Sequence, residues 1–393
     1  MSSVLKTVLN YQQQNTDFIA LEQASIERDM EELKRQNATL ESLYALSDSI
    51  QSLSASNEDF GHLTSKVSLE GIMDSIVEHV KKFKDFVIKI ITKIYDFIKS
   101  ILNKLISLFK KKNEEENKDR NEATVKKTIE IHGNESLGIV LFLINKPIED
   151  VRKDYIFSES DAQRLVPGFI DTINKTKHIY HDSLNKIGSL LKDIEPANLN
   201  EILSGEWVKK IAEHFRVNNE MVFELPLGKS ILRLKENKYY DRFDVVFEFL
   251  NYKGDVFDGF SQTKAFRKYL SEPQNVQLPA IQHNTNSINS AVRDFEHIFD
   301  KEACLKLFNE HGVIKYEEEF DNTIQGIEDN SLRSDVIFAF RKATRIERRL
   351  LDFFARYLHC LGIFVSDISV DLSMIIDRSS KTINQSMKKD KPS

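Results

Sequence analysis

Apolar residues recur at three- and four-residue steps over long stretches of this chain, which predicts long amphipathic helices. The strongest stretch is residues 71–112, where lysines lie largely opposite the apolar side. As one helix it would be roughly 60 Å long at ~1.5 Å per residue, and Ser100 or Asn103 is the place where we expect any break. The apolar face consists of Phe83, Val87, Ile90, Ile94, Phe97, Ile101, Leu105 and Leu108.

Three interpretations fit the apolar face of residues 71–112. It is the core face of a buried helix, the membrane-facing side of a surface helix, or a docking element for another protein. The isoleucine-rich, β-branched composition favours burial over an isolated helix. Residues 113–127 are almost entirely polar and charged, so we expect them to form an exposed linker.

Residues 1–70 carry a second helical pattern, which predicts one or two amphipathic helices. Its apolar positions are Ile26, Met30, Leu33, Leu40, Leu43, Leu46, Ile50 and Leu53, with Asn37 at one seam position. This segment either packs on the rest of the protein or is a detachable helix that docks on a partner. The serine-rich stretch 52–59 and then Gly61 favour detachment, because such sequences form exposed, protease-accessible segments.

Residues 128–393 predict a mainly helical body with a small antiparallel sheet, so the fold class is mainly α with some β (α+β). We expect strands at 128–132 and 137–144, a pair of strands about a turn within 222–234, and a strand or a helix at 243–250. We expect helices at 158–194, 198–215, 287–308 and 331–387, the last one long and interrupted, if anywhere, at Gly362.

Composition supports this helical picture and excludes several protein classes. The 393 residues include only 13 Gly and 7 Pro, which is few for a β-rich chain. Cys304 and Cys360 have no CxxC partner, so neither a disulfide framework nor a structural zinc site is expected. No uninterrupted apolar run reaches the ~18 residues of a spanning helix, and the N-terminus lacks a signal-peptide pattern. We therefore expect a protein that is neither secreted by a signal peptide nor membrane-spanning.

Charge is distributed unevenly along the chain. Residues 1–70 have a formal net charge of −6, residues 71–112 of +6 and residues 113–393 of −6. The whole chain is also −6. Removal of the first 70 residues would therefore leave a neutral remainder.

Motifs that carry chemistry are lacking, so no enzymatic activity and no cofactor are expected. The sequence contains no GxGxxG, GxxxxGK[ST], HExxH, GxSxG or EF-hand pattern. His178 and His181 are three residues apart on a predicted helix and could share a metal ion with Asp182, or they are simply solvated. The acidic residues 317–319 with Asp321 could hold a divalent ion, but a helix or loop surface explains them more simply.

A basic cluster on the predicted C-terminal helix is the remaining candidate site. Much of it shares one helix face, as phosphate binding would require. Glu347 and Asp352 are interleaved with it, however, so a salt-bridged solvent face is the alternative. The cluster consists of Arg341, Lys342, Arg345, Arg348, Arg349 and Arg356.

The order of these segments resembles the internal head proteins of large tailed bacteriophages (jumbo phages or related myoviruses). The resemblance is closest over residues 40–112 and rests on an acidic leader, Ser68-Leu69-Glu70, Gly71 and a lysine-rich helix ending at 109–112. It implies that the phage maturation protease, which cuts after glutamate in a small-x-Glu setting, removes residues 1–70 as a propeptide. The cleavage site would then be Ser68, Leu69, Glu70 and Gly71.

Other tripeptides in the chain also fit the small-x-Glu pattern, among them those that end at Glu22, Glu27 and Glu58. Glu70 is favoured because it separates a polar stretch from the start of the strongest helix.

The resemblance implies a non-enzymatic internal virion protein located in the capsid interior, and in the host cytoplasm during synthesis and after ejection. Its expected partners are the procapsid scaffold or core, the maturation protease and packaged DNA, with a membrane surface as a further candidate and the host target unknown. Two alternatives remain: a peripheral membrane protein acting through residues 71–112, and a host-directed enzyme with a site in the body.

Overall fold

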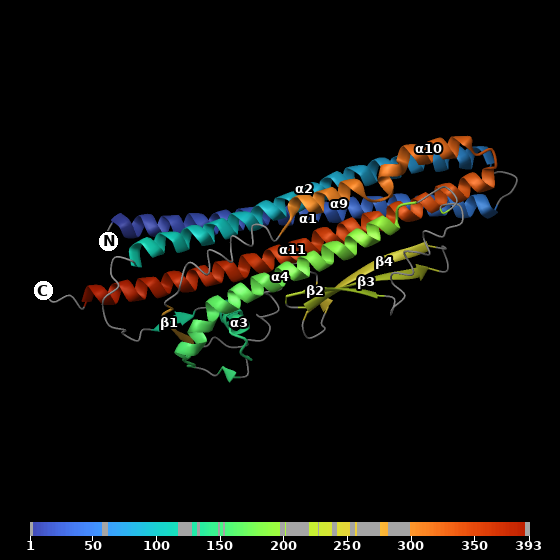
Figure 1. Ribbon diagram of the computed structural model, residues 1–393. Helices are drawn as coiled ribbons and strands as arrows, with labels where there is room; N and C mark the ends of the chain where they lie inside the picture. The colour runs from blue at the N-terminus through green and yellow to red at the C-terminus, as the bar shows by residue number, and fades with distance from the viewer. Residues whose placement is uncertain are drawn as a thin grey trace.

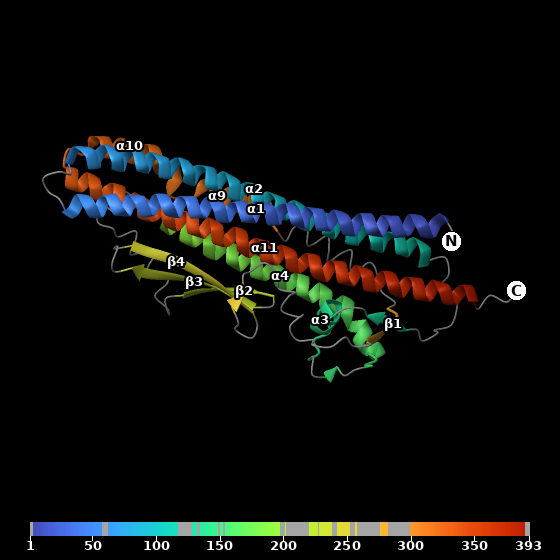
Figure 2. The same cartoon turned by 180° about the vertical axis from the view of Figure 1, so that it is seen from behind.

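Three long helices lie side by side along the molecule in the computed structural model (Figure 1). They are α1 (Ser3–Ser56), α2 (His62–Glu116) and α11 (Asn330–Lys389). The helices α2 and α11 both run in the direction opposite to α1. The N-terminus and the C-terminus therefore lie at the same end of the molecule (Figures 1 and 2). With 60 residues, α11 is about 90 Å long, which makes the molecule elongated.

The structure describes most of the chain. The described residues are 3–56, 62–116, 128–131, 134–147, 150–151, 154–196, 201, 220–226, 228–237, 242–251, 256–257, 276–281 and 299–389. The predicted helix at 198–215 and the predicted linker after residue 116 lie almost wholly outside them, whereas residues 113–116 continue α2.

A fourth long helix, α4 (Glu159–Asp193), lies along α11 and confirms the predicted helix at 158–194. It begins with a capping box in which the Ser158 side chain accepts a hydrogen bond from the Asp161 backbone N–H and the Asp161 carboxylate accepts one from the Ser158 backbone N–H. Such reciprocal bonds satisfy backbone donors that the first helical turn leaves unpaired. The sequence therefore determines the start of this helix locally.

Two small antiparallel sheets flank the helices. The larger has the order β2 (Glu220–Leu225), β3 (Gly228–Asn237), β4 (Arg242–Asn251) and β5 (Val256–Phe257), which confirms the predicted strand pair and makes 243–250 a strand. The smaller pairs β1 (Thr128–Ile131) with β6 (Val276–Pro279). The larger sheet packs on α11 through aromatic rings. The ring centroids of Phe223 in β2 and Phe353 in α11 are 4.8 Å apart.

One predicted strand is wrong: residues 137–144 fall largely within the helix α3 (Asn134–Leu143). The segment is apolar at nearly every position, and its side chains are buried on all sides. A short run of this kind has no periodicity that separates a buried strand from a buried helix. Its surroundings therefore decide its conformation.

Neither α2 nor α11 is broken at the positions where the sequence left room for a break. At Gly362, in the middle of α11, a Cβ atom would lie 3.2 Å from Cγ2 of Ile94 on α2. The glycine thus allows two helices to approach closely rather than ending one. Three short elements lie against α2 before α11 begins: α9 (Lys301–Glu310), η2 (Val313–Tyr316) and α10 (Glu317–Gly326).

A single apolar core joins the long helices. It includes half of the seam predicted on α1 and most of the apolar face predicted on α2. The buried members are Ile26, Met30, Leu33 and Leu40 on α1, and Phe83, Val87, Ile90, Ile94, Phe97, Ile101 and Leu105 on α2. The side chains of Leu108, Ile50 and Leu53 lie outside the described set. In this fold the α2 face is therefore a core face and is not open to a membrane or a partner.

Within the described residues, one helical stretch is long and apolar enough to cross a membrane by length and composition. It is Ser331–Thr382 of α11, and most of its apolar window is buried inside the protein, as in the core helix of a helical bundle.

Candidate functional site

The predicted basic face of the C-terminal helix lies against the N-terminal helix. Positions 341, 345, 348 and 349 fall on one side of α11 because of their helical spacing. Arg341, Arg345 and Arg348 are at most 8% exposed, and the side chain of Arg349 is 31% exposed. We call these four side chains the arginine face. In this conformation it is covered by α1 and is not open to nucleic acid.

Glu41 of α1 is the central counter-ion of the arginine face. Its Oε2 lies 2.5 Å from Nη2 of Arg345, and its Oε1 lies 2.6 Å from Nη2 of Arg349. The same Oε1 pairs with Arg348, whose side chain is fully buried. Burial raises the pKa of the Glu41 carboxyl, but the facing guanidinium groups outweigh this effect, so the pKa lies below its ordinary value. Glu41 is therefore held as a carboxylate.

Asp48 repeats this arrangement seven residues further along α1. Its Oδ1 lies 2.9 Å from Nη2 of Arg341, and its Oδ2 lies 3.6 Å from Nη1 of Arg345. Arg341 also donates to the Ser47 hydroxyl. Because seven residues make almost two helical turns, Glu41 and Asp48 lie on the same side of α1 and follow the arginine face along α11.

Neutral side chains of α1 complete the contact. Asn37 accepts a hydrogen bond from Arg348, and the Tyr44 hydroxyl donates to Oγ1 of Thr344 over 3.1 Å. The guanidinium group of Arg345 lies 5.1 Å from the centre of the Tyr44 ring, a cation–π distance. Burial raises the pKa of Tyr44 to about 12, so this hydroxyl stays neutral and can donate.

The polar network at this interface is only partly balanced. Two carboxylates face four guanidinium groups, and in the described part of the chain Nε of Arg348 and Nδ2 of Asn37 are buried without a hydrogen-bond partner. Removing charges from water costs free energy that ion pairs offset only when their geometry is complete. We infer that α1 is held mainly by its apolar seam, while the network fixes its register on α11.

The other two members of the predicted basic cluster do not join the arginine face. Arg356 pairs with Asp352 on its own helix, with Nε 3.0 Å from Oδ1, and lies over the ring of Phe247 in β4. The ammonium group of Lys342 lies 4.1 Å from the centre of the Phe338 ring. The six cations that looked equivalent in sequence thus have three different surroundings.

The predicted cleavage segment lies in the first part of α2. Residues 68–71 are helical, whereas the sequence pattern had placed them between an exposed polar stretch and the start of the helix. Gly71 is exposed, and a Cβ atom there would meet nothing within 4 Å. The side chains of Ser68, Leu69 and Glu70 lie outside the described set. A protease needs an extended substrate, so cleavage here requires the first turns of α2 to open.

His178 and His181 lie on α4, the first exposed and the second half-buried. Burial lowers the pKa of His181 below its ordinary value. Among the described residues, no group of three or more His, Cys, Asp or Glu side chains is placed to hold a metal ion.

A fully buried carboxylate, that of Glu347, holds the turn between α9 and η2. Its Oε2 accepts hydrogen bonds from the backbone N–H groups of Val313 (2.7 Å) and Ile314 (3.0 Å), and its Oε1 lies 3.5 Å from Nζ of Lys84. Burial raises the pKa of Glu347, and Lys84 and the two N–H groups oppose this. The acidic residue that seemed to interrupt the basic cluster therefore faces the opposite side of α11 and has a structural role.

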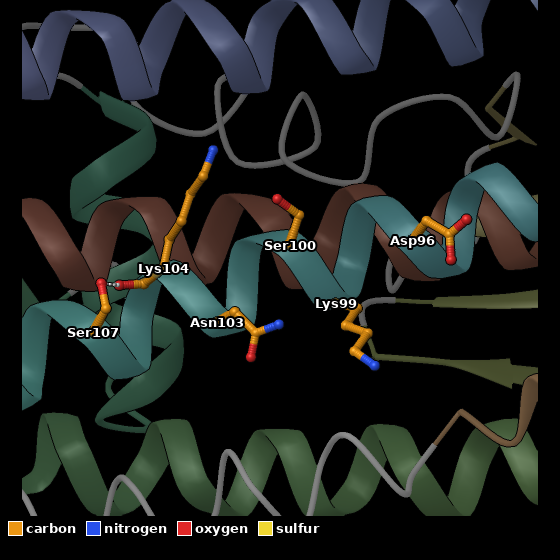
Figure 3. A pocket seen from close by; sticks show the side chains of 6 residues that line it. All are labelled: Asp96, Lys99, Ser100, Asn103, Lys104 and Ser107. Carbon is orange, nitrogen blue, oxygen red and sulfur yellow. Dashed lines mark hydrogen bonds between the residues drawn. The ribbon is translucent and has the colours of Figure 1, made fainter.

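A shallow hollow of about 460 Å³ lies on α2 between Asp96 and Ser107. Figure 3 shows that all its lining side chains come from this one helix and that Lys99 and Lys104 point in opposite directions. Asp96 is engaged by Lys301, with Oδ1 3.0 Å from Nζ. Because these groups do not converge, the hollow lacks the arrangement of a small-molecule site.

Sequence reasoning found the arginines but missed their partners. Glu41 and Asp48 were visible as an acidic pair at a seven-residue interval on a predicted helix, matching the spacing of Arg341 and Arg348. Since about 300 residues separate the two sets, only the fold brings them together.

Taken together, the geometry defines an elongated helical-bundle protein whose most developed polar site is an internal contact between its first and last helices. Residues 16–139, which cover most of α1, all of α2 and the segment up to α3, match the family model of phiKZ-like phage internal head proteins. This match confirms, over about a third of the chain, the resemblance to phage internal head proteins seen in the sequence. No curated protein and no solved structure matches the chain.

Proposed function

We propose that this chain is a non-enzymatic internal virion protein and that residues 1–70 form a leader that directs it into the assembling head. The match over residues 16–139 carries the proposal, because it covers most of the leader and the helix that follows. The leader has a net charge of −6, and Leu21 and Leu46 remain 69% and 50% exposed on α1. These features give a procapsid scaffold both charge and apolar side chains to contact.

We propose further that the maturation protease cuts after Glu70. Gly71 has open space around it, and glycine in a helix interior weakens the helix by about 1 kcal/mol relative to alanine, which favours local opening near this end of α2. The cut separates the acidic leader from a remainder whose formal net charge is zero. The remainder then no longer carries the negative charge that opposes close approach to DNA.

The mass and N-terminal sequence of the protein from purified virions test the cleavage. The expected result is a chain that starts at Gly71, whereas the recombinant chain starts at Met1 or Ser2. With the phage protease in vitro, Glu70→Gln should abolish this cut, and the matched change Glu58→Gln should leave it intact. An uncleaved N-terminus in mature virions contradicts the proposed propeptide.

The mature chain is also proposed to leave the head with the genome. Tagged protein should then appear inside host cells soon after infection, and it should stay in the particle when DNA ejection is blocked. Recovery of the whole amount from emptied particles would argue against ejection.

A further inference from the structure

The described carboxylate partners of the arginine face, Glu41 and Asp48, belong to the segment that the proposed cleavage removes. In the described structure the ion pairs of Arg345, Arg348 and Arg349 end on Glu41 or Asp48 of α1. Arg341 pairs with Asp48 and donates to Ser47, again on α1. Departure of α1 would therefore remove these counter-ions at once and open this side of α11 to solvent.

The arrangement of guanidinium groups that binds the carboxylates of α1 is also suited to binding phosphate groups. Guanidinium groups bind carboxylate and phosphate oxygens through the same planar set of N–H donors. Here four of them lie within about 12 Å along one helix, given ~1.5 Å per residue. Glu41 and Asp48, seven residues apart on one helix face, thus occupy positions at which successive anionic groups of a linear polymer could bind.

We propose that α1 blocks a DNA-binding site, and that the arginine face binds the phosphate backbone of double-stranded DNA once α1 has left. This inference rests on the proposed removal of the leader. DNA is favoured because the site is a linear stripe of four arginines and because residues 16–139 match a family of phage internal head proteins. The loss of the −6 leader acts in the same direction, since it removes long-range repulsion of DNA.

The test uses the full chain with a recognition sequence for a sequence-specific protease inserted between Ser56, where α1 ends, and His62, where α2 begins. The folded protein is cut, the leader is removed by gel filtration in high salt with mild denaturant, the remainder is returned to native buffer, and its binding to a fluorescent 20-base-pair duplex is measured. The uncut chain should bind weakly. The cut chain should bind with an affinity that falls roughly 100-fold between 50 and 200 mM salt, as expected for four phosphate contacts.

Matched variants separate the arginine face from general charge. In the cut chain, Arg345→Gln with Arg348→Gln should reduce the salt dependence by about two contacts. Lys175→Gln with Lys306→Gln, which removes the same charge from two exposed lysines on other helices, should not. If the cut chain aggregates, the uncut Glu41→Gln, Asp48→Asn chain serves instead and should bind DNA more tightly than the unaltered uncut chain.

Several results would overturn the inference: a leader that stays attached even in high salt with mild denaturant, a cut chain that binds DNA no better than the uncut one, or equal losses in both pairs of variants. Tighter binding to vesicles of anionic lipid than to DNA would also overturn it and would point to a membrane surface. Because the cut is engineered, the result does not depend on the virion protein's own N-terminus. A virion chain that starts at Gly71 but shows no gain in DNA binding keeps the maturation proposal and removes this one.

Discussion

Replacing Glu41 with alanine is expected to lower the free energy of unfolding by about 3 kcal/mol, because it leaves the buried guanidinium of Arg348 without a carboxylate. Arg345 keeps Asp48, and Arg349 reaches water, so the loss falls mainly on Arg348. Urea denaturation followed by circular dichroism measures the change. Glu31→Ala is the control, because it removes an exposed ion pair with Lys34 and should leave stability unchanged.

A double variant tests whether the charge or the packing matters. Glu41→Leu with Arg348→Leu removes both partners and should recover most of the stability lost in Glu41→Ala, because paired buried charges can be replaced by apolar side chains at little cost. If the double variant is less stable than Glu41→Ala, the explanation by an unpaired buried charge is wrong.

The same contact predicts a dependence on acid. The pKa of Glu41 is lowered in the folded protein, so its stabilising effect is fully present above the ordinary value of 4.5 and is lost as the pH falls below that value through the lowered one. The difference in stability between the unaltered chain and Glu41→Gln should therefore shrink on acidification from about pH 6 to about pH 3. A difference that stays constant over this range would contradict the assignment.

Gly312→Ala is expected to lower the free energy of unfolding by about 3 kcal/mol, from a strained backbone and a displaced buried carboxylate together. Gly312 has φ 106° and ψ 165°, a conformation essentially restricted to glycine. An alanine Cβ would also clash with Oε1 of Glu347, whose Oε2 accepts the hydrogen bonds from the Val313 and Ile314 backbone N–H groups. With alanine at position 312, the turn cannot keep both this backbone conformation and its hydrogen bonds to the Glu347 carboxylate.

Gly326→Ala is the matched control for the turn. Gly326 ends α10, and a Cβ atom there would meet nothing within 4 Å, so its stability should stay within about 0.5 kcal/mol of the unaltered chain. Thermal and urea unfolding of both variants provide the comparison. Equal stability of the two variants would show that the contact between Glu347 and the turn contributes little.

Local pattern was enough to predict the long helices and the hairpin. The apolar spacing of residues 71–112 and 331–387 matches α2 and α11, and the Ser158 capping box marks the start of α4. These signals succeed because periodicity and capping depend on residues within a few positions of each other. Where periodicity is lacking, as in the apolar run 137–144, the predicted strand was wrong.

The sequence by itself determined the mainly helical class, the segregation of charge along the chain and the resemblance that the family match confirmed. Tertiary structure alone decided what covers each face. It buried the apolar side of α2 in the core, paired Glu41 and Asp48 with arginines about 300 residues away, and turned Glu347 toward a backbone turn. A helix pattern states which side of a helix is apolar or charged. Which partner satisfies that side depends on contacts between distant segments, and these arise only from the packing of the whole chain.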